Sequence, residues 1–201
     1  DNRGESILIS KKPIGVVAGI LPWNFPLFLI ARKAGAALIA GCSIVIKPAQ
    51  LTPENCCEFA KVVDETGLPK GLFNVVTGKG SVIGNALAAS PKIDIVSVTG
   101  SVGAGESIMK AAANNITKVS LELGGKAPVV VFPDADLELA AQAILDSRIG
   151  NNGQICNNAE RLYLHKDIYD KMVALLTEKF KAVKVGDPFS SDDIDMGPLE
   201  S

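Results

Sequence analysis

The feature that most constrains this 201-residue chain is the alternation of two hydrophobic periods along its first part. Short runs rich in valine and isoleucine, each typical of a buried strand, stand at residues 14–20, 43–47, 72–76 and 93–99. Stretches with helical spacing lie between them, at about residues 27–40, 53–66, 80–89 and 102–115. This alternation predicts an α/β fold, a Rossmann-like parallel sheet with helices on both faces.

A second α/β region is predicted after Gly125. The runs at 127–132 and 161–164 are expected to be strands, and a helix with an aspartate at its cap is expected between them. An amphipathic helix follows and is expected to end near Gly186. We place a domain boundary near Gly124 and Gly125, so residues 125–201 form the start of the second domain.

The helix predicted over residues 53–66 carries the clearest end signals in the chain. Thr52 is expected at the N-cap, Pro53 at the first helical position, and Glu54 adds early negative charge. Gly67 is expected to end this helix.

Charge and hydropathy exclude two classes of partner. The formal net charge is −2 and the basic residues are scattered, which argues against nucleic acid and against a membrane surface. The apolar stretch at 25–46 has Arg32 and Lys33 near its middle and Gly41 as a divider, so it is expected to be a helix and a strand rather than a membrane span.

The four cysteines also restrict the chemistry. Cys42, Cys56, Cys57 and Cys156 show no CxxC spacing, and His165 is the single histidine, so we expect no metal site. Free thiols without a signal peptide favour a cytoplasmic protein.

Cys156 stands in an unusual setting for a cysteine. It ends the stretch GNNGQIC, residues 150–156, whose glycines and asparagines are typical of a turn. Two interpretations are open, since the residue is either an incidental loop thiol or a thiol placed to react.

Other candidate residues follow the predicted strands, where ligands of parallel sheets bind. Asn24, in LPWNFP, either caps the next helix or serves as an amide donor held by flanking prolines. Lys47, in IKPAQ, is either an ordinary lysine at the sheet rim or a contact for a cofactor hydroxyl or phosphate.

Two further segments with candidate residues also stand at the ends of predicted strands. In VTGSVGAG, Gly100 and Gly105 allow close backbone approach, and Ser101 stands where a helix N-terminus favours an anion. This is not a complete GxGxxG pattern, so alone it is weak evidence. In VSLEL, alternation directs Glu122 away from the apolar face, either as a solvated carboxylate or as a general base.

Together these motifs resemble the NAD(P)-dependent aldehyde dehydrogenase superfamily. LPWNFP, IKPAQ, VTGSVGAG, LELGGK and GQIC stand in that family's order and spacing over essentially the whole chain. The runs ISKKPIGVVAGILPWNFP and GQICNNAERLYLHK look most like its lactaldehyde/glycolaldehyde dehydrogenase branch.

The resemblance implies roles for three catalytic residues. Cys156 would be the nucleophile that attacks the aldehyde carbon. The Asn24 amide and the Cys156 backbone N–H would stabilise the oxyanion. Glu122 would activate the water that hydrolyses the thioester.

The same resemblance implies the cofactor-binding residues. Lys47 would bind the adenosine ribose, and Ser101, at the helix beginning near Gly100, would hold the pyrophosphate. The remaining residues expected around the cofactor are Ile20, Pro22, Trp23, Gln50, Gly80, Gly105, Leu123 and Gly124.

The resemblance also implies which part of a longer protein this chain represents. Residues 1–12 would be part of the bridging strands used for oligomerisation, residues 13–124 a partial NAD(P)-binding domain, and residues 125–201 the N-terminal part of the catalytic domain. The chain looks like an internal fragment, and the whole protein is expected to be a homodimer or homotetramer.

Substrate and cofactor are expected to be a small aldehyde and NAD. Gln50 replaces a glutamate that many NAD-preferring members carry, so NADP is not excluded. Asn157 and Asn158 after the cysteine fit a small hydroxyaldehyde such as lactaldehyde or glycolaldehyde. Two alternatives stay open: an acylating dehydrogenase that uses coenzyme A, against which Glu122 argues, and a dinucleotide-binding fragment without catalysis.

Overall fold

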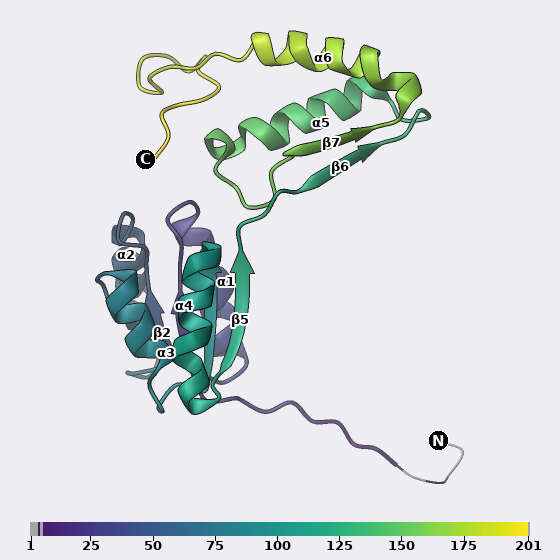
Figure 1. Cartoon of the computed structure of the whole chain (residues 1–201). Coiled ribbons are helices and arrows are strands. Elements are labelled where there is room, and N and C mark those ends of the chain that lie inside the picture. The colour runs from purple at the N-terminus through teal and green to yellow at the C-terminus, as the bar shows by residue number, and fades with distance from the viewer. Residues whose placement is uncertain (1–3, 5, 201) are drawn as a thin grey trace. The chain divides into compact units, whose positions relative to one another are not determined.

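The protein is seen here in a computed structural model that describes residue 4 and residues 6–200. The chain divides into two compact units, with the division between Leu123 and Gly124 (Figure 1). Each unit is described by itself. Within the described residues, no helix combines the length and apolar character that a membrane crossing requires.

The first unit contains a five-stranded parallel sheet, as the alternation of periods predicts. Its strands, in the spatial order β3-β2-β1-β4-β5, are β1 (Val16–Ile20), β2 (Ser43–Lys47), β3 (Phe73–Val75), β4 (Ile95–Gly100) and β5 (Lys118–Leu123). Its helices are α1 (Pro26–Ile39), α2 (Glu54–Glu65), a π-helical turn (Gly80–Gly84), α3 (Asn85–Ala88), α4 (Val102–Ala112) and a 3₁₀ turn (Ala113–Asn115).

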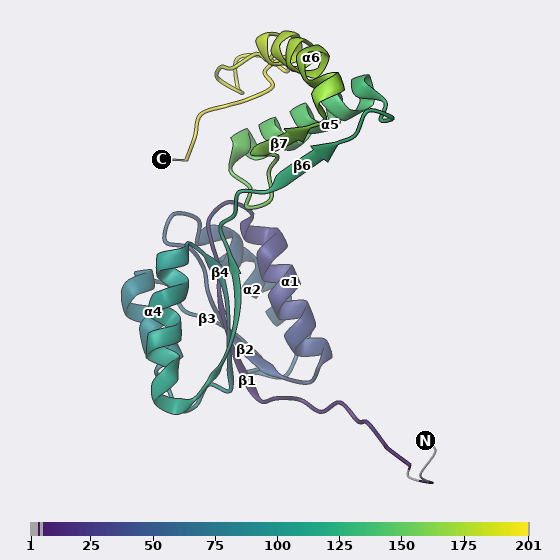
Figure 2. The same cartoon turned by 45° about the vertical axis from the view of Figure 1, so that its right-hand side comes forward.

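Helices cover both faces of this sheet. Successive side chains of β1 point to opposite faces, so Val17 packs into one buried cluster and Ala18 into the other. The first cluster joins α1 and α2 to β1 and β2, and the second joins α3 and α4 to β1, β4 and β5. Figure 2 shows α1 and α4 on opposite sides of the strands.

Strand order reverses at β1, which pairs with β2 on one side and with β4 on the other. In open parallel sheets, ligands bind in the crevice beyond the carboxyl ends of the strands at such a reversal. The Leu21 N–H donates to the Lys47 carbonyl at 3.0 Å, which ties the ends of β1 and β2 together.

The second unit begins a separate sheet. Its elements are β6 (Pro128–Val131), α5 (Leu137–Ile149), a 3₁₀ turn (Gly150–Gly153), β7 (Arg161–Leu164), a second 3₁₀ turn (Lys166–Ile168) and α6 (Tyr169–Lys181). The Asp136 side chain caps α5 by accepting from the Leu139 N–H at 3.1 Å. β6 and β7 are parallel, and their buried side chains share one core with α5 and α6.

Two expectations about helix ends are wrong. Pro53, not Thr52, is the N-cap residue of α2, and the Thr52 hydroxyl donates instead to the Trp23 carbonyl at 3.5 Å. α6 ends at Lys181, before Gly186, because Ala182 already closes the helix with bonds to the preceding turn.

One further segment differs from the prediction. The helix expected over 80–89 starts as a π-helical turn and becomes α-helical only at Asn85. Residues 6–12 lie in no strand of this single chain, and their role in bridging strands of an oligomer stays a prediction. Residues 1–3 and 5 of that expected segment lie outside the described residues.

Candidate functional site

Most of the residues that the sequence singles out lie where the strands of the first unit end. Parallel strands bring their carboxyl ends to one edge of the sheet. Pro22, Trp23 and Asn24 follow β1, and Lys47 ends β2. Gly100 with Ser101, and Glu122 with Leu123, stand at the ends of β4 and β5, whereas Gly124 and Cys156 belong to the second unit.

Lys47 is the most unusual residue at this edge. Its side chain is 3% exposed, and among the described residues its ammonium has no hydrogen-bond or ion-pair partner. Burial lowers the pKa of Lys47 below its ordinary value. A Cβ added at Gly80 would lie 3.6 Å from Lys47 Nζ, so this glycine leaves space beside the cation. Among the described residues, Asn158 Nδ2 is the one fully buried side-chain polar atom without a partner, so the Lys47 ammonium itself reaches the surface and is open to a ligand with hydroxyl or phosphate oxygens.

The loop after β1 is held from two sides. Ile20 is buried in the core, and the Trp23 carbonyl accepts the bond from Thr52. Trp23 and Asn24 are themselves half-buried, and the N-cap position of α1 is Phe25. Gln50, in the loop after β2, is exposed.

The segment after β4 forms a regular helix start. Ser101 is the N-cap of α4, and its hydroxyl accepts from the Ala104 N–H at 3.2 Å. The first amides of α4 therefore stand at the crevice, in the arrangement that favours an anion. Gly105 is buried, and a Cβ added there would lie 2.9 Å from Leu123 Cδ2. Close packing against Leu123 therefore explains why a glycine stands at this position.

Glu122 lies on the polar side of β5, as its alternation predicts. Exposure alternates along β5, with Val119, Leu121 and Leu123 half-buried and Glu122 exposed. The Glu122 carboxylate is 3.8 Å from the Arg32 guanidinium, and both side chains are more than half exposed.

Sequence analysis missed a second cation beside this carboxylate. Lys33 on α1 donates from Nζ to the Ser97 hydroxyl at 2.8 Å. Burial first, and the neighbouring Arg32 charge second, lower the pKa of Lys33 from 10.5 to about 8, while Glu122 opposes this shift. From the sequence, Arg32 and Lys33 are only charges within an apolar stretch that oppose a membrane span. Their partners, Glu122 and Ser97, are far away in the sequence.

In the second unit, Cys156 is exposed on a loop with unusual backbone geometry. Asn151, Asn152 and Gly153 have φ values of 48°, 58° and 77°, in the left-handed region that asparagine and glycine tolerate best. The composition of GNNGQIC is thus explained by the turn that precedes the thiol.

Two side chains of this loop hold a later segment of the chain. Asn152 accepts from the Gly197 N–H at 3.0 Å and donates to the Pro198 carbonyl at 2.8 Å. Gln154 accepts from the Glu200 N–H at 2.9 Å. No sequence signal links positions so far apart, so these roles could not be predicted.

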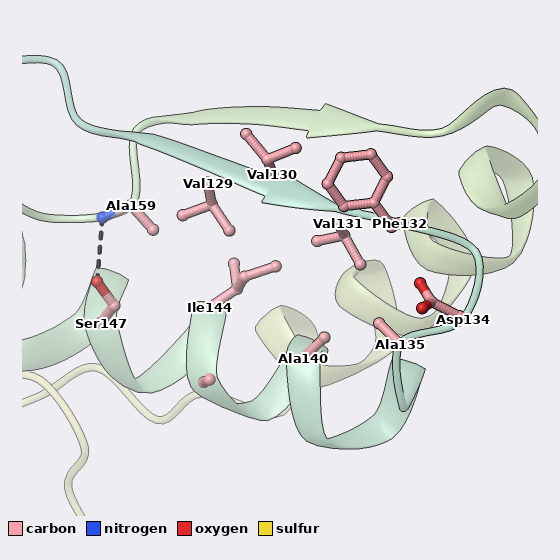
Figure 3. Close-up of a pocket in the computed structure, with 11 residues that line it drawn as sticks. Val129, Val130, Val131, Phe132, Asp134, Ala135, Ala140, Ile144, Ser147 and Ala159 are labelled. Carbon is pink, nitrogen blue, oxygen red and sulfur yellow. Dashed lines mark hydrogen bonds between the residues drawn. The ribbon is translucent and has the colours of Figure 1, made fainter.

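The second unit also contains an apolar groove of about 370 Å³ between β6 and α5 (Figure 3). Val129, Val131 and Ile144 are among its lining residues, and the Ser147 hydroxyl at its end accepts from the Ala159 N–H at 3.0 Å. None of the predicted site residues lines this groove.

The strand order, its reversal at β1 and the capped start of α4 are those of a Rossmann-like α/β unit. Comparison with known proteins gives the family. A model of the aldehyde dehydrogenase family matches residues 1–201, and the chain belongs to that family.

Several relatives are similar over nearly the whole chain. Lactaldehyde dehydrogenase of Escherichia coli (strain K12) is 59% identical over 199 residues, which cover 99% of this chain and 42% of that protein. The 3,6-anhydro-alpha-L-galactose dehydrogenase of Vibrio sp. (strain EJY3) is 48% identical and is covered to 41%. The chain therefore spans about two fifths of the length of these relatives.

Solved structures agree with the fold. A structure of the Escherichia coli lactaldehyde dehydrogenase has a TM-score of 0.91, with 94% of this chain and 40% of that chain covered. Aldehyde dehydrogenase C of Pseudomonas syringae, a C291A mutant in complex with NAD⁺ and octanal, is 39% identical, with a TM-score of 0.90 and coverage of 94% and 39%. A 3,6-anhydro-L-galactose dehydrogenase in complex with NAP is 48% identical, with a TM-score of 0.89 and coverage of 94% and 40%.

Proposed function

We propose that this chain carries the cofactor contacts and the nucleophile of an NAD(P)-dependent aldehyde dehydrogenase that oxidises a small hydroxyaldehyde, such as lactaldehyde or glycolaldehyde, to a carboxylic acid. The observation that carries the proposal is the exposed Cys156 on its preformed turn, in a chain that is 59% identical to a lactaldehyde dehydrogenase.

The residues of the first unit fit a dinucleotide. The unpartnered Lys47 ammonium would take ribose hydroxyls, and the capped start of α4 at Ser101 would take the pyrophosphate. Ile20, Pro22, Trp23, Gly80, Gly100 and Leu123 of this unit would surround the cofactor, together with Gly124 at the start of the second unit. When bound, NAD(P)⁺ supplies the hydride acceptor.

The residues of the chain would perform the rest of the reaction. The Cys156 thiolate would add to the aldehyde carbon, and the carbonyl oxygen would become an oxyanion bonded by the Asn24 amide and the Cys156 N–H. After oxidation the acyl group would be held as a thioester of Cys156. Glu122 would accept a proton from the water that attacks this thioester, which releases the acid and restores the thiol.

The cofactor is proposed to be NAD, with NADP not excluded. Exposed Gln50 carries no charge, so it would repel a 2′-phosphate less than a carboxylate would. Calorimetric titration of the two cofactors measures the preference, and equal affinity would contradict an NAD-only enzyme.

Cys156→Ala in the whole protein tests the assigned nucleophile. We expect oxidation of lactaldehyde to be abolished and cofactor affinity to stay nearly unchanged, because the side chain acts on the substrate carbon. Initial rates of NADH formation and a cofactor titration measure the two effects. Surviving oxidation in Cys156→Ala would refute the role of Cys156. In the wild-type protein, a preference for long aliphatic aldehydes over short hydroxylated ones would refute the proposed substrate class.

A further inference from the structure

The loop that carries Cys156 is connected at its base to three separate parts of the second unit. It leaves α5 after Ile149 and enters β7 at Arg161. It also touches the segment before β6, because a Cβ added at Gly125 would lie only 2.9 Å from the Cys156 carbonyl oxygen. The position of Cys156 therefore depends on how these three parts are held together.

Glu160, the residue before β7, is paired with a cation from each of the other two parts. Its Oε1 accepts from Arg148 Nη1 at 3.0 Å, and its Oε2 is paired with Lys126 Nζ. The Glu160 side chain is 21% exposed, whereas Arg148 is 39% and Lys126 is 71% exposed, so the pair with Arg148 is the better shielded of the two. Lys126 first, and then Arg148, lower the pKa of Glu160, which keeps the carboxylate ionised.

Backbone and side-chain bonds reinforce the Lys126 side. The Ala127 carbonyl accepts from the N–H groups of Glu160 and Arg161, each at 3.2 Å. Arg161 Nε donates to the Lys126 carbonyl at 2.8 Å. These bonds hold Lys126 and Ala127 against residues 160–161, and the preceding Gly125 then limits where the Cys156 carbonyl can lie.

The Arg148 side supports the opposite end of the loop. The guanidinium carbon of Arg148 would be 3.7 Å from a Cβ added at Gly153, and its carbonyl oxygen would be 3.3 Å away. Arg148 thus packs under the turn that leads into Gln154 and Cys156.

From these contacts we infer that Glu160 is a positioning residue for Cys156. The Glu160 carboxylate pairs with both Arg148 and Lys126. Arg148 packs under the turn before Cys156, and Lys126 follows Gly125, which lies against the Cys156 carbonyl. This inference rests on the proposed function, since a fixed thiol matters to catalysis only if Cys156 is the nucleophile. Small displacements of a reacting group reduce rates strongly, which is why such a clamp matters.

The test compares Glu160→Gln with the matched variant Glu138→Gln in the 201-residue chain. Glu138 lies on α5 and pairs with Lys179 at 3.6 Å, so its loss removes an ion pair of the same unit away from the loop. Two readouts are measured: amide hydrogen exchange of residues 150–158, and the ratio of the rates at which an anionic and a neutral reagent alkylate Cys156.

We expect Glu160→Gln to speed exchange of the loop by roughly threefold to tenfold, the size that two partly exposed ion pairs suggest. We also expect alkylation of Cys156 by an anionic reagent to speed up relative to a neutral reagent, because a negative charge is lost while Lys126 and Arg148 remain. A loss of packing alone would change the two rates alike. Glu138→Gln should change neither readout.

Glu160→Asp separates geometry from charge and covers the case in which Glu160→Gln unfolds the unit. Its carboxylate lies one methylene closer to the backbone, which keeps the charge but lengthens the pairing with the two cations, so loop exchange should rise while the ratio of the two alkylation rates stays in place. Wild-type loop exchange in Glu160→Asp, or wild-type values of both readouts in a folded Glu160→Gln, would overturn the inference. Neither readout needs turnover, so failure of the proposed function would show separately, as oxidation that survives Cys156→Ala.

Discussion

At the scale of single residues, a largely buried lysine without a partner is the most informative feature of the first unit. Partial desolvation of its ammonium costs stability unless a partner compensates it. Lys47 is 3% exposed and has no such partner among the described residues, and its position at the end of β2 is where ligands of this fold bind. The cost is understandable if a bound molecule supplies the missing contacts.

Lys47→Met is therefore expected to weaken NAD binding and to leave the free chain at least as stable. Loss of a hydrogen bond from a charged group corresponds to roughly a tenfold to hundredfold loss of affinity. Calorimetric titration and urea denaturation measure the two effects. Lys92→Met, at an exposed lysine, is the control. Unchanged NAD affinity in Lys47→Met would contradict the assignment.

The lowered pKa of Lys33 leads to a prediction about how the free energy of unfolding depends on pH. In the folded chain Lys33 loses its proton near pH 8, whereas its ordinary pKa is 10.5. Between these values the unfolded chain binds more protons, so the free energy of unfolding should rise with pH, by at most about 3 kcal/mol from this residue. Lys33→Met should remove that part of the rise. Urea denaturation at several pH values between about 8 and 10.5 measures the free energy of unfolding of both proteins. If this free energy rises equally with pH in the wild type and in Lys33→Met, Lys33 is not responsible.

At the scale of elements, the start of α4 combines stability with ligand binding. The Ser101 hydroxyl caps the helix, so Ser101→Ala should reduce stability by about 1 kcal/mol. Ser101→Asn, which can also cap, should preserve it. If both variants unfold at the same denaturant concentration, the cap contributes nothing measurable.

The sequence predicts elements well where local signals decide them and poorly where distant contacts decide them. The valine-rich and isoleucine-rich runs predict the parallel sheet, and the alternation in β5 predicts that Glu122 points away from its apolar side. The start of α2 is wrong by one residue because the Thr52 hydroxyl bonds to Trp23, in a loop almost thirty positions earlier.

The same limit applies to the candidate site. The positions of Lys47, at the end of β2, and of Ser101, directly after β4, are predictable because the strand pattern is visible in the sequence. The partners of Lys33 and of Glu160 are not, since the Ser97 hydroxyl and the Lys126 ammonium lie on other elements. Only the folded chain shows which charges meet.

At the scale of the whole molecule, the residues proposed for catalysis are divided between two units. Asn24 and Glu122 belong to the first unit and Cys156 to the second. If the proposed function holds, binding of NAD to the first unit changes the reactivity of a thiol of the second. The four cysteines provide internal comparisons, because Cys42 and Cys56 are buried and Cys57 and Cys156 are exposed.

The most direct test measures alkylation rates of all four cysteines by mass spectrometry at neutral pH, with and without NAD. Burial raises the pKa of Cys56 to about 12, so it should react slowly, as should buried Cys42. We expect Cys156 to be labelled fastest, and we expect NAD to change its rate but not that of Cys57. Equal rates for Cys156 and Cys57, both insensitive to NAD, would contradict the claim that this chain assembles a nucleophile beside a cofactor site.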